Sequence, residues 1–341
     1  MLLTDTHLKR DNGNLVKSIV RQCIDLAIEI GVQKIIHVGD WFDISSGKMV
    51  AGKFIHGQPE SCLHDTIEMF GWFAEHNISF YIVPGNHEKS NRDSENSYLD
   101  IFSNYPNINV LRSHSDMVDL GDSTHAYSLP YFTNSYVDRL KSISPNGSRN
   151  ILLTHKGVDG ARNNDGSKVE SDAQECLFDK FDLVLCGDYH NKHSVNSKIH
   201  YIGSAYQANF GEDEEKGFTI LYDDLSFDQI ISDFPKFIKY EIDLINLNSN
   251  DIQQLIKEKE SGDNIKIEIT GDSEKLKSFD KTELESFGIQ TVLKSPESII
   301  SKSEDNSIIY DKESIIDSFV MFCKENEFEL DEYVLEKMEM I

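Results

Sequence analysis

Five short apolar runs within the first 190 residues each end in a polar turn, and this repetition constrains the fold more than any other feature. Stretches with helical spacing separate the first three runs, one carrying Leu15, Ile19 and Cys23 and the other spanning residues 62–76. Such an alternation of strands and helices predicts an α/β fold. Ligand sites of open α/β sheets gather at the carboxyl ends of the strands. The five runs are residues 1–4, 34–38, 79–83, 150–153 and 183–186.

The first part of the chain is expected to form one large domain. We predict two facing sheets, a β-sandwich flanked by helices, over residues 1–230. Further strands are expected at residues 124–129, 200–202 and 217–222.

After about residue 235 the pattern changes. Apolar and polar residues alternate in 237–242 and 265–269, as in half-buried strands, and helices are expected at 251–259 and 282–287. We therefore predict a small α+β capping domain over 235–294. A stretch rich in Ser, Lys, Glu and Asp follows at 295–310 and predicts a linker, and two amphipathic helices are expected in a C-terminal tail over 311–341.

The turns after the five apolar runs carry carboxylate, amide and imidazole side chains. Hard oxygen ligands mixed with imidazoles suit Mn²⁺, Mg²⁺, Fe or Zn²⁺, which polarise phosphate and lower the pKa of a bound water. One carboxylate, that of Asp40, is placed to bridge two ions about 3.5–4 Å apart. The most economical partition gives one ion Asp5, His7, Asp40 and His190, and the other Asp40, Asn86, His155 and Asp188.

Neighbours of these ligands have supporting roles in the hypothesis. His87 is too crowded beside Asn86 to be a good ligand, but it is well placed to give a proton to a leaving alkoxide. Glu88 and Asp43 are expected to orient nearby imidazoles. His193 is an alternative ligand to Asp188, although it is expected to turn outward.

Several other polar residues have simpler interpretations. His37 lies within an apolar run and is expected to be a hydrogen-bonded core residue. The acidic run 212–215 is expected to be a solvated loop. Lys89, Arg92 and Lys192 flank the ligand turns, where they either grip phosphates or are ordinary surface residues.

The overall charge limits the possible substrates. With 33 basic and 59 acidic side chains, the net charge is −26. Such a chain repels nucleic acid beyond a Debye length of about 8–10 Å. Two divalent ions restore about four positive charges locally, which favours a phosphate already in the cleft but does not capture a long duplex. Either the substrate is small or a basic partner holds the polymer.

Composition also indicates the compartment. The five cysteines are scattered and form no CxxC pair, which fits reduced thiols. No apolar run approaches the roughly 20 residues needed to span a bilayer, and no signal-peptide pattern is present. We therefore expect a cytoplasmic protein that does not enter a membrane, in the host cytoplasm if the source is viral.

The ligand turns form the motifs Asp5-x-His7, Gly39-Asp40-x-x-Asp43, Gly85-Asn86-His87-Glu88, His155 and Gly187-x-x-His190. A later segment contains Tyr201-Ile202-Gly203-Ser204, Gln207, Phe210-Gly211-Glu212 and Lys216-Gly217, and Pro235-Lys236-Phe237 follows it. Taken together, the motifs resemble those of the calcineurin-like metallophosphoesterase superfamily. The later segment is similar to the end of the catalytic domain in SbcD-type and Mre-type DNA double-strand-break repair nuclease subunits, and Pro235-Lys236-Phe237 resembles the entry to their capping domain. The layout is most like that of phage recombination endonuclease subunits.

The resemblance implies a manganese-dependent exonuclease and single-strand endonuclease that acts on DNA ends by a two-metal mechanism, with Mg²⁺ as the other possible metal. It implies that His87 is the acid for the leaving group. It also implies an SbcC-type SMC-like ATPase partner, bound through the C-terminal helices, and a homodimer formed through the catalytic domain.

Two positions depart from the family pattern. Asp188 stands where the family usually has an imidazole, and a harder carboxylate there favours Mn²⁺ or Mg²⁺ over softer metals. Glu88 stands where Asp is common, which changes the reach of the side chain and keeps its charge.

Two other functions fit the same residues. One is a small-molecule phosphatase or cyclic nucleotide phosphodiesterase of the same superfamily, which the acidic charge favours. The other is a weakly active scaffold subunit, in which Asp188 marks a weakened metal site.

Overall fold

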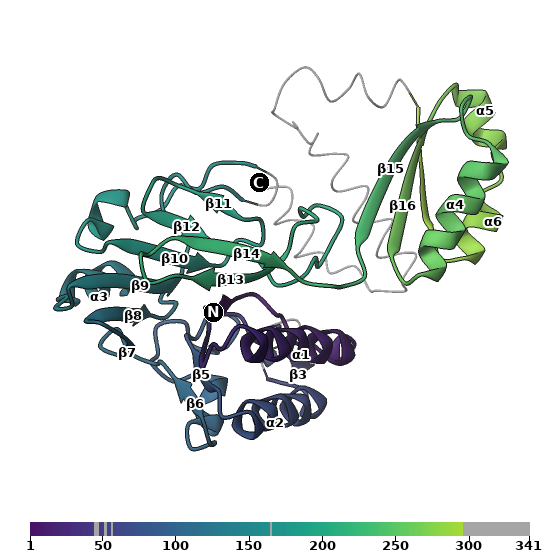
Figure 1. The fold of residues 1–341 in the computed structure, drawn as a ribbon. Helices are drawn as coiled ribbons and strands as arrows, with labels where there is room; N and C mark the ends of the chain where they lie inside the picture. Colours follow the sequence, from purple (N-terminus) through teal and green to yellow (C-terminus); the bar gives the residue numbers. More distant parts are fainter. Residues whose placement is uncertain (44–47, 51–52, 56, 164–165, 296–341) are drawn as a thin grey trace. The chain divides into compact units, whose positions relative to one another are not determined.

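The computed structural model describes residues 1–43, 48–50, 53–55, 57–163 and 166–295 (Figure 1). The chain divides into two compact units, one of Met1–Lys239 with Lys257–Lys266 and the other of Tyr240–Ile256 with the residues from Ile267 onward. The expected C-terminal helices, and all of the expected linker but its first residue, lie outside the described residues.

The first unit contains two sheets of six strands each. The first sheet has the order β14-β13-β1-β2-β5-β6, with its strands β1, β2, β5 and β6 parallel. β13 pairs with β1, and β14 with β13, in the antiparallel sense. The strands are β1 (Leu2–Leu3), β2 (Lys34–His37), β5 (Ser79–Ile82), β6 (Ile108–Val110), β13 (Gly217–Leu221) and β14 (Phe227–Ile231).

The second sheet has the order β11-β12-β10-β9-β8-β7. Strands β8, β9, β10 and β12 are parallel, and the edge strands β7 and β11 are antiparallel to their neighbours. The strands are β7 (Met117–Gly121), β8 (Thr124–Leu129), β9 (Arg149–His155), β10 (Leu183–Gly187), β11 (His193–Ser194) and β12 (Ile199–Tyr201). A separate hairpin consists of β3 (Lys48–Val50) and β4 (Lys53–Ile55).

The two sheets face each other across a shared apolar layer. Alternate residues of one strand point to opposite faces of its sheet. In β10, Leu183 and Leu185 join residues of the first sheet in the layer between the sheets, whereas Val184 and Cys186 belong to the cluster on the outer face. These runs are buried on both faces, which explains why they read as continuously apolar. The predicted α/β sandwich is confirmed.

Helices cover the outer faces of the sandwich (Figure 1). Helices α1 (Gly13–Glu29) and α2 (Glu60–Glu75) pack with the first sheet in one core cluster. Gly31, at φ 75°, ends α1 in a left-handed conformation that glycine adopts without steric strain. Helix α3 (Tyr136–Ser142) packs with the second sheet through Tyr136 and Leu140. Two short 3₁₀ helices are also present, η2 (Tyr98–Phe102) and η3 (Glu175–Phe178).

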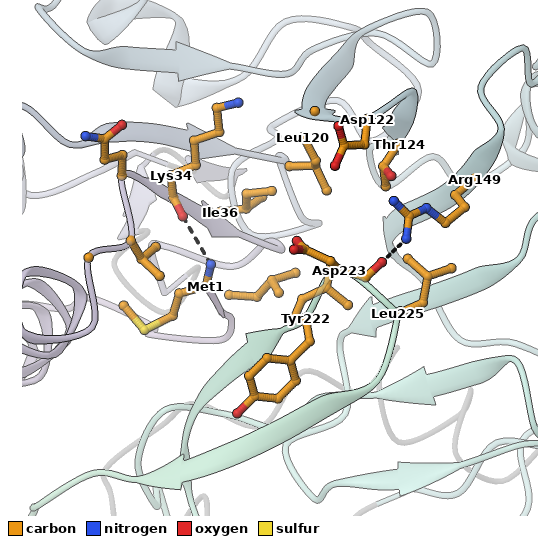
Figure 2. A pocket seen from close by; sticks show the side chains of 16 residues that line it. Met1, Lys34, Ile36, Leu120, Asp122, Thr124, Arg149, Tyr222, Asp223 and Leu225 are labelled. Carbon is orange, nitrogen blue, oxygen red and sulfur yellow. Dashed lines mark hydrogen bonds between the residues drawn. The ribbon is translucent and has the colours of Figure 1, made fainter.

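A hollow of about 380 Å³ lies at the amino-terminal ends of several strands (Figure 2). Its lining includes Lys34 at the start of β2, Thr124 at the start of β8 and Arg149 at the start of β9. Arg149 donates a hydrogen bond to the carbonyl of Asp223 there. This hollow is at the opposite ends of the strands from the predicted ligand turns.

A three-stranded sheet of order β15-β16-β17 forms the C-terminal part of the described chain, with helices on one face (Figure 1). Ile265, Ile267 and Ile269 of β16 alternate into a buried layer, as the predicted period of two requires. The Asp272 side chain accepts backbone N–H bonds at the start of α5. The elements are β15 (Phe237–Asp243), α4 (Ser249–Glu260), β16 (Asn264–Thr270), α5 (Ser273–Ser278), α6 (Thr282–Ser286) and β17 (Gln290–Lys294). Among the described helices, none has the length and apolar character needed to cross a membrane.

Candidate metal centre

Four predicted metal ligands sit in unusual backbone conformations at the carboxyl ends of strands. Asp5 and His7 follow β1 with φ of 53° and 42°, Asp40 follows β2 with 57°, and Asp188 follows β10 with 93°. Positive φ is uncommon in residues other than glycine, and such strain concentrates at functional sites. The turns therefore hold these side chains in directions that a relaxed turn would not give.

Close approach of the turns requires glycine at their starts. A Cβ atom on Gly187 would collide with the Thr4 hydroxyl and the Val38 carbonyl, and one on Gly85 would collide with the Asp40 carboxylate. The glycines that precede the ligands thus let turns from both sheets meet at one edge of the sandwich.

One group of ligand atoms comes from Asp5, His7 and His190. The Nε2 atoms of His7 and His190 are 3.0 Å apart. Asp5 Oδ1 lies 3.7 Å from His7 Nε2 and 3.9 Å from His190 Nε2. One atom from each residue can therefore reach a common cation.

The second group gathers around His155. Its Nε2 atom lies 3.0 Å from Asp40 Oδ2 and 3.9 Å from Asp188 Oδ1. Asp40 Oδ2 is also 4.0 Å from His7 Nε2, so this carboxylate stands between the two groups. Asn86 lines a small hollow together with Asp188. Asp5 Oδ1 is 3.9 Å from His155 Nε2, which puts Asp5 near both groups as well.

Buried polar atoms without partners mark the place where cations would bind. Eight buried side-chain polar atoms of the described residues have no hydrogen-bond partner, and three of them, Asp5 Oδ1, Asn86 Oδ1 and His155 Nε2, belong to the cluster. An unsatisfied buried polar atom is destabilising by about 1–3 kcal/mol. All three belong to predicted metal ligands, so the donor set fits a pair of divalent cations.

Electrostatics favour the charged form of Asp5 and Asp40, whereas burial raises the pKa of the third carboxylate ligand, Asp188, to about 6. Burial acts to raise the pKa of Asp5, but His7, His155 and His190 overcome it and hold the pKa at about 2. The imidazoles around Asp40 likewise hold its pKa far below the usual range, despite burial. Burial acts to lower the pKa of His7, but Asp5 and Asp40 raise it to about 9. Without metal, protons on His7 and His155 balance the carboxylates, and cations would replace these protons.

His87 lies at the edge of the cluster. Its Nε2 atom is 3.7 Å from Asp40 Oδ2 and its Nδ1 atom is 3.9 Å from Asp43 Oδ1. The backbone N–H of His87 donates to Asp40 Oδ1 at 3.0 Å. Burial lowers the pKa of His87. The ring of His87 meets that of His7 edge to face, with centroids 4.9 Å apart.

Glu88 has a different role from the one predicted. Its buried carboxylate accepts three backbone N–H bonds, from Asp40 at 3.0 Å, Phe42 at 2.8 Å and Gly85 at 2.7 Å, instead of contacting an imidazole. Burial and the neighbouring Asp40 raise the pKa of Glu88 to about 7. Glu88 therefore ties the turn after β2 to the turn after β5.

Two charged residues that the sequence suggested to be exposed are buried. Glu212, from the acidic run, lies with Oε1 2.7 Å from His190 Nδ1. Lys89 donates to the carbonyls of Ser94 and Tyr131 and lies over the Phe132 ring, so it does not face the cleft as a phosphate ligand. Glu212 stands within the segment that resembles the end of a nuclease catalytic domain, and that resemblance was the one signal for it.

The remaining histidine predictions concern His193 and His37. His193 Nε2 accepts the Arg162 N–H, and its ring stacks on Tyr201, so it is engaged away from the cluster. His37 is buried, with Nε2 3.1 Å from the Thr6 hydroxyl, which confirms the predicted core role.

Comparison with known proteins gives one family and several relatives. Residues 1–192 match the calcineurin-like phosphoesterase family. The DNA double-strand break repair protein Mre11 of Sulfolobus acidocaldarius is 26% identical over 166 residues, 46% of this chain and 40% of that protein. The SbcD component of the nuclease SbcCD of Staphylococcus epidermidis is 26% identical over 245 residues, 61% of this chain and 62% of that protein. The putative phosphoesterase 244L of Invertebrate iridescent virus 6 is 21% identical over 299 residues, 83% of this chain and 98% of that protein.

The aligned regions cover only part of the chain and part of some relatives. The chain spans less than half the length of the Sulfolobus relative. The family match covers the strands and turns that carry every predicted metal ligand.

Proposed function

Because this chain belongs to the calcineurin-like phosphoesterase family, we propose that it is a two-metal phosphodiesterase that cleaves DNA. Members of the family are hydrolases that use divalent metals, and the acidic and imidazole cluster provides candidate ligands for such ions. The proposed metal is Mn²⁺, with Mg²⁺ as the alternative, because the carboxylate and amide ligands outnumber the imidazoles and the set holds no soft thiolate.

The observation that carries the proposal is the place of Asp40 between two ligand groups. Its Oδ2 atom lies 3.0 Å from His155 Nε2 and 4.0 Å from His7 Nε2. A carboxylate in this position suits a pair of ions about 3.5–4 Å apart. In this assignment one ion has Asp5, His7, Asp40 and His190, and the other has Asp40, Asn86, His155 and Asp188.

The chemistry then divides between the ions and the chain. When bound, the two ions would supply Lewis-acid stabilisation and an activated water. His87 is close enough to His7 and Asp40 to share a cation with them, but in this assignment it belongs to neither ligand group and would hold the proton that the departing 3′-oxygen needs. Asp43 Oδ1, 3.9 Å from His87 Nδ1, acts to raise the pKa of His87 against the effect of burial. Glu88 would preserve the spacing of the turns through its three backbone bonds.

DNA is proposed as the substrate on the basis of the relatives, one described as a DNA repair protein and one as part of a nuclease. The net charge of −26 opposes DNA binding by the isolated chain. We therefore propose an SbcC-type ATPase partner that supplies the basic surface, docking on the helices expected over 311–341. A homodimer through the catalytic domain and a cytoplasmic location complete the proposal.

The decisive assay compares two substrates in Mn²⁺. Wild-type protein and His87→Ala are tested on defined DNA, with and without the ATPase, and on bis-p-nitrophenyl phosphate. The p-nitrophenolate group leaves without a proton, so His87→Ala should lose DNA cleavage by about 10²–10⁴-fold and retain most p-nitrophenyl turnover. Equal losses on both substrates, with Mn²⁺ still bound, would refute the acid role.

The net charge also supports a second candidate, a phosphodiesterase for small substrates. In that case the chain would turn over bis-p-nitrophenyl phosphate but would not cut DNA, whether or not the ATPase is present. Fewer than two ions under saturating Mn²⁺ would instead favour a scaffold protein with a weakened site at Asp188.

A further inference from the structure

Glu212 is fixed by several contacts beside His190, one of the candidate metal ligands. Its Oε1 atom lies 2.7 Å from His190 Nδ1 and accepts from Asn209 Nδ2 at 2.9 Å. Its Oε2 atom accepts the Ala208 N–H at 3.1 Å and lies 3.4 Å from Lys216 Nζ. The residue is 6% exposed. A buried carboxylate with four partners has little freedom to move away from the imidazole.

This contact determines which nitrogen of His190 is available for a metal. A carboxylate accepts hydrogen bonds, so Nδ1 of His190 carries the hydrogen and Nε2 keeps its lone pair. Nε2 is the atom that lies 3.0 Å from His7 Nε2 and 3.9 Å from Asp5 Oδ1. The His190 ring therefore points Nε2, the nitrogen that can bind a metal, toward His7 and Asp5.

Lys216 completes the support. Its side chain is fully buried and donates to the His190 carbonyl at 2.6 Å and to Asn191 Oδ1 at 2.9 Å. The same lysine balances the charge of Glu212. One buried ion pair therefore fixes both the imidazole and the backbone of His190.

The other imidazole group is supported differently. His155 Nδ1 lies 2.8 Å from the Val38 carbonyl, a neutral acceptor. A carboxylate partner makes an imidazole a stronger electron donor than a carbonyl partner does. The two ligand groups, one containing His190 and one containing His155, are therefore not equivalent.

We propose that Glu212 is a positioning residue that makes the ion bound by Asp5, His7 and His190 the tighter of the two. This inference rests on the proposed two-metal function, and it assigns a role to Glu212 and Lys216 that the ligand turns alone do not reveal. Mutation of such a hydrogen-bond partner of a metal-bound histidine typically weakens metal binding by about 10- to 100-fold.

The test is calorimetric titration of the full, metal-free chain with Mn²⁺ and no substrate. Glu212→Gln keeps an oxygen that can accept from His190 and removes the charge. Glu215→Gln is the matched control, because Glu215 is an exposed residue of the same acidic run. We expect Glu212→Gln to lower the affinity for the more tightly bound Mn²⁺ ion by about 10- to 100-fold. The affinity for the other ion should change by no more than about twofold. The control should leave both unchanged.

A second variant distinguishes a direct loss of metal affinity from a loss caused by misfolding. Glu212→Gln alone leaves Lys216 buried without its partner charge, so the double variant Glu212→Gln/Lys216→Met restores charge balance. It should fold like the wild type, as judged by circular dichroism, and still lose affinity for that one ion. Unchanged affinity for both ions, or an equal loss for both, would overturn the proposal. Because no substrate is present, this result is independent of whether the chain cleaves phosphodiesters.

Discussion

The Glu88 carboxylate accepts the backbone N–H of Asp40 at 3.0 Å, and so supports the residue that stands between the two ligand groups. Its other bonds, to the N–H groups of Phe42 and Gly85, join the turns after two neighbouring strands. The position of the Asp40 carboxylate therefore depends on the buried carboxylate of Glu88. Glu88 acts through backbone N–H groups and not through an imidazole. Glu88 therefore supports the backbone of the turn that carries the central ligand.

Replacing Glu88 by alanine should destabilise the fold and disturb the metal centre together. The change strips three buried N–H groups of their acceptor, each worth about 1–3 kcal/mol. We expect Glu88→Ala to lower the free energy of unfolding by several kcal/mol and to weaken Mn²⁺ binding, whereas the exposed Glu75→Ala should do neither. Urea unfolding and calorimetry measure the two effects. A variant with normal stability and normal metal binding would rule out this role.

The shape of the turn after β2 can be tested with a pair of glycines. Gly39 and Gly31 both have positive φ, of 98° and 75°, so alanine strains the backbone at either position. A Cβ atom on Gly39 would also collide with the His155 ring, whereas one on Gly31 meets no atom within 4 Å. We expect Gly39→Ala to lose metal binding and Gly31→Ala to keep it at a cost of about 1 kcal/mol in stability. Similar behaviour of the two variants in a metal titration would contradict the packing argument.

Asp188 offers a test of metal preference. Its Oδ1 atom lies 3.9 Å from His155 Nε2, at a position where the family resemblance implies an imidazole. An imidazole ligand suits Zn²⁺ better than it suits Mg²⁺, and a carboxylate favours the harder ions. We therefore expect Asp188→His to shift competition toward Zn²⁺ by about tenfold or more, measured by displacement of Mn²⁺. If the ratio of affinities stays the same, Asp188 does not bind the ion.

Acid sensitivity should depend on His37, a buried histidine that borders the ligand groups without belonging to either. Burial lowers the pKa of His37 to about 3, against about 6.5 for an unfolded chain. As the pH falls below about 6.5, the unfolded state binds a proton at His37 that the folded state does not bind. The stability that neutral His37 contributes is therefore complete above about pH 6.5 and declines as the pH falls toward about 3. The slope from this residue approaches about 1.4 kcal/mol per pH unit.

The matched variants are His37→Gln, which keeps a hydrogen-bond partner for Thr6, and the exposed His76→Gln. Urea unfolding in chelator between about pH 4 and pH 7 gives the comparison, because the ligand histidines then titrate alike in every sample. His37→Gln should show a shallower loss of stability than the wild type, and His76→Gln should match the wild type. Parallel curves for wild type and His37→Gln would show that His37 is not responsible.

The ligand turns were predictable because local and global patterns agree there. His155 ends β9 and Asp188 follows β10, and both strands have apolar interiors, so their carboxyl ends could be read from the sequence. The family motifs added the pairing of distant turns. The charged residues behind the ligands were not predictable in the same way. Glu212 has the same composition around it as its exposed neighbours, and its contacts with His190 and Lys216 distinguish it from them.

Glu88 is a second charged residue whose contacts could not be predicted from the sequence. Its charge and place beside His87 suggested an imidazole partner, but its carboxylate oxygens are occupied by backbone N–H groups that come from 46 and 48 residues earlier in the chain as well as from Gly85. Lys89 was expected to face solvent or phosphate, and its contacts with Phe132 and the Tyr131 carbonyl depend on how the sheet edge folds over it. Tertiary contacts of single polar residues leave no periodic signal in a sequence.

The central claim is that turns from both sheets hold two neighbouring cations joined by Asp40. Anomalous diffraction at the manganese edge from crystals soaked in Mn²⁺ tests it most directly. We expect two peaks about 3.5–4 Å apart, both bound by Asp40, with Asp5, His7 and His190 around one and Asn86, His155 and Asp188 around the other. A single peak, or two peaks that share no contact with Asp40, would contradict it.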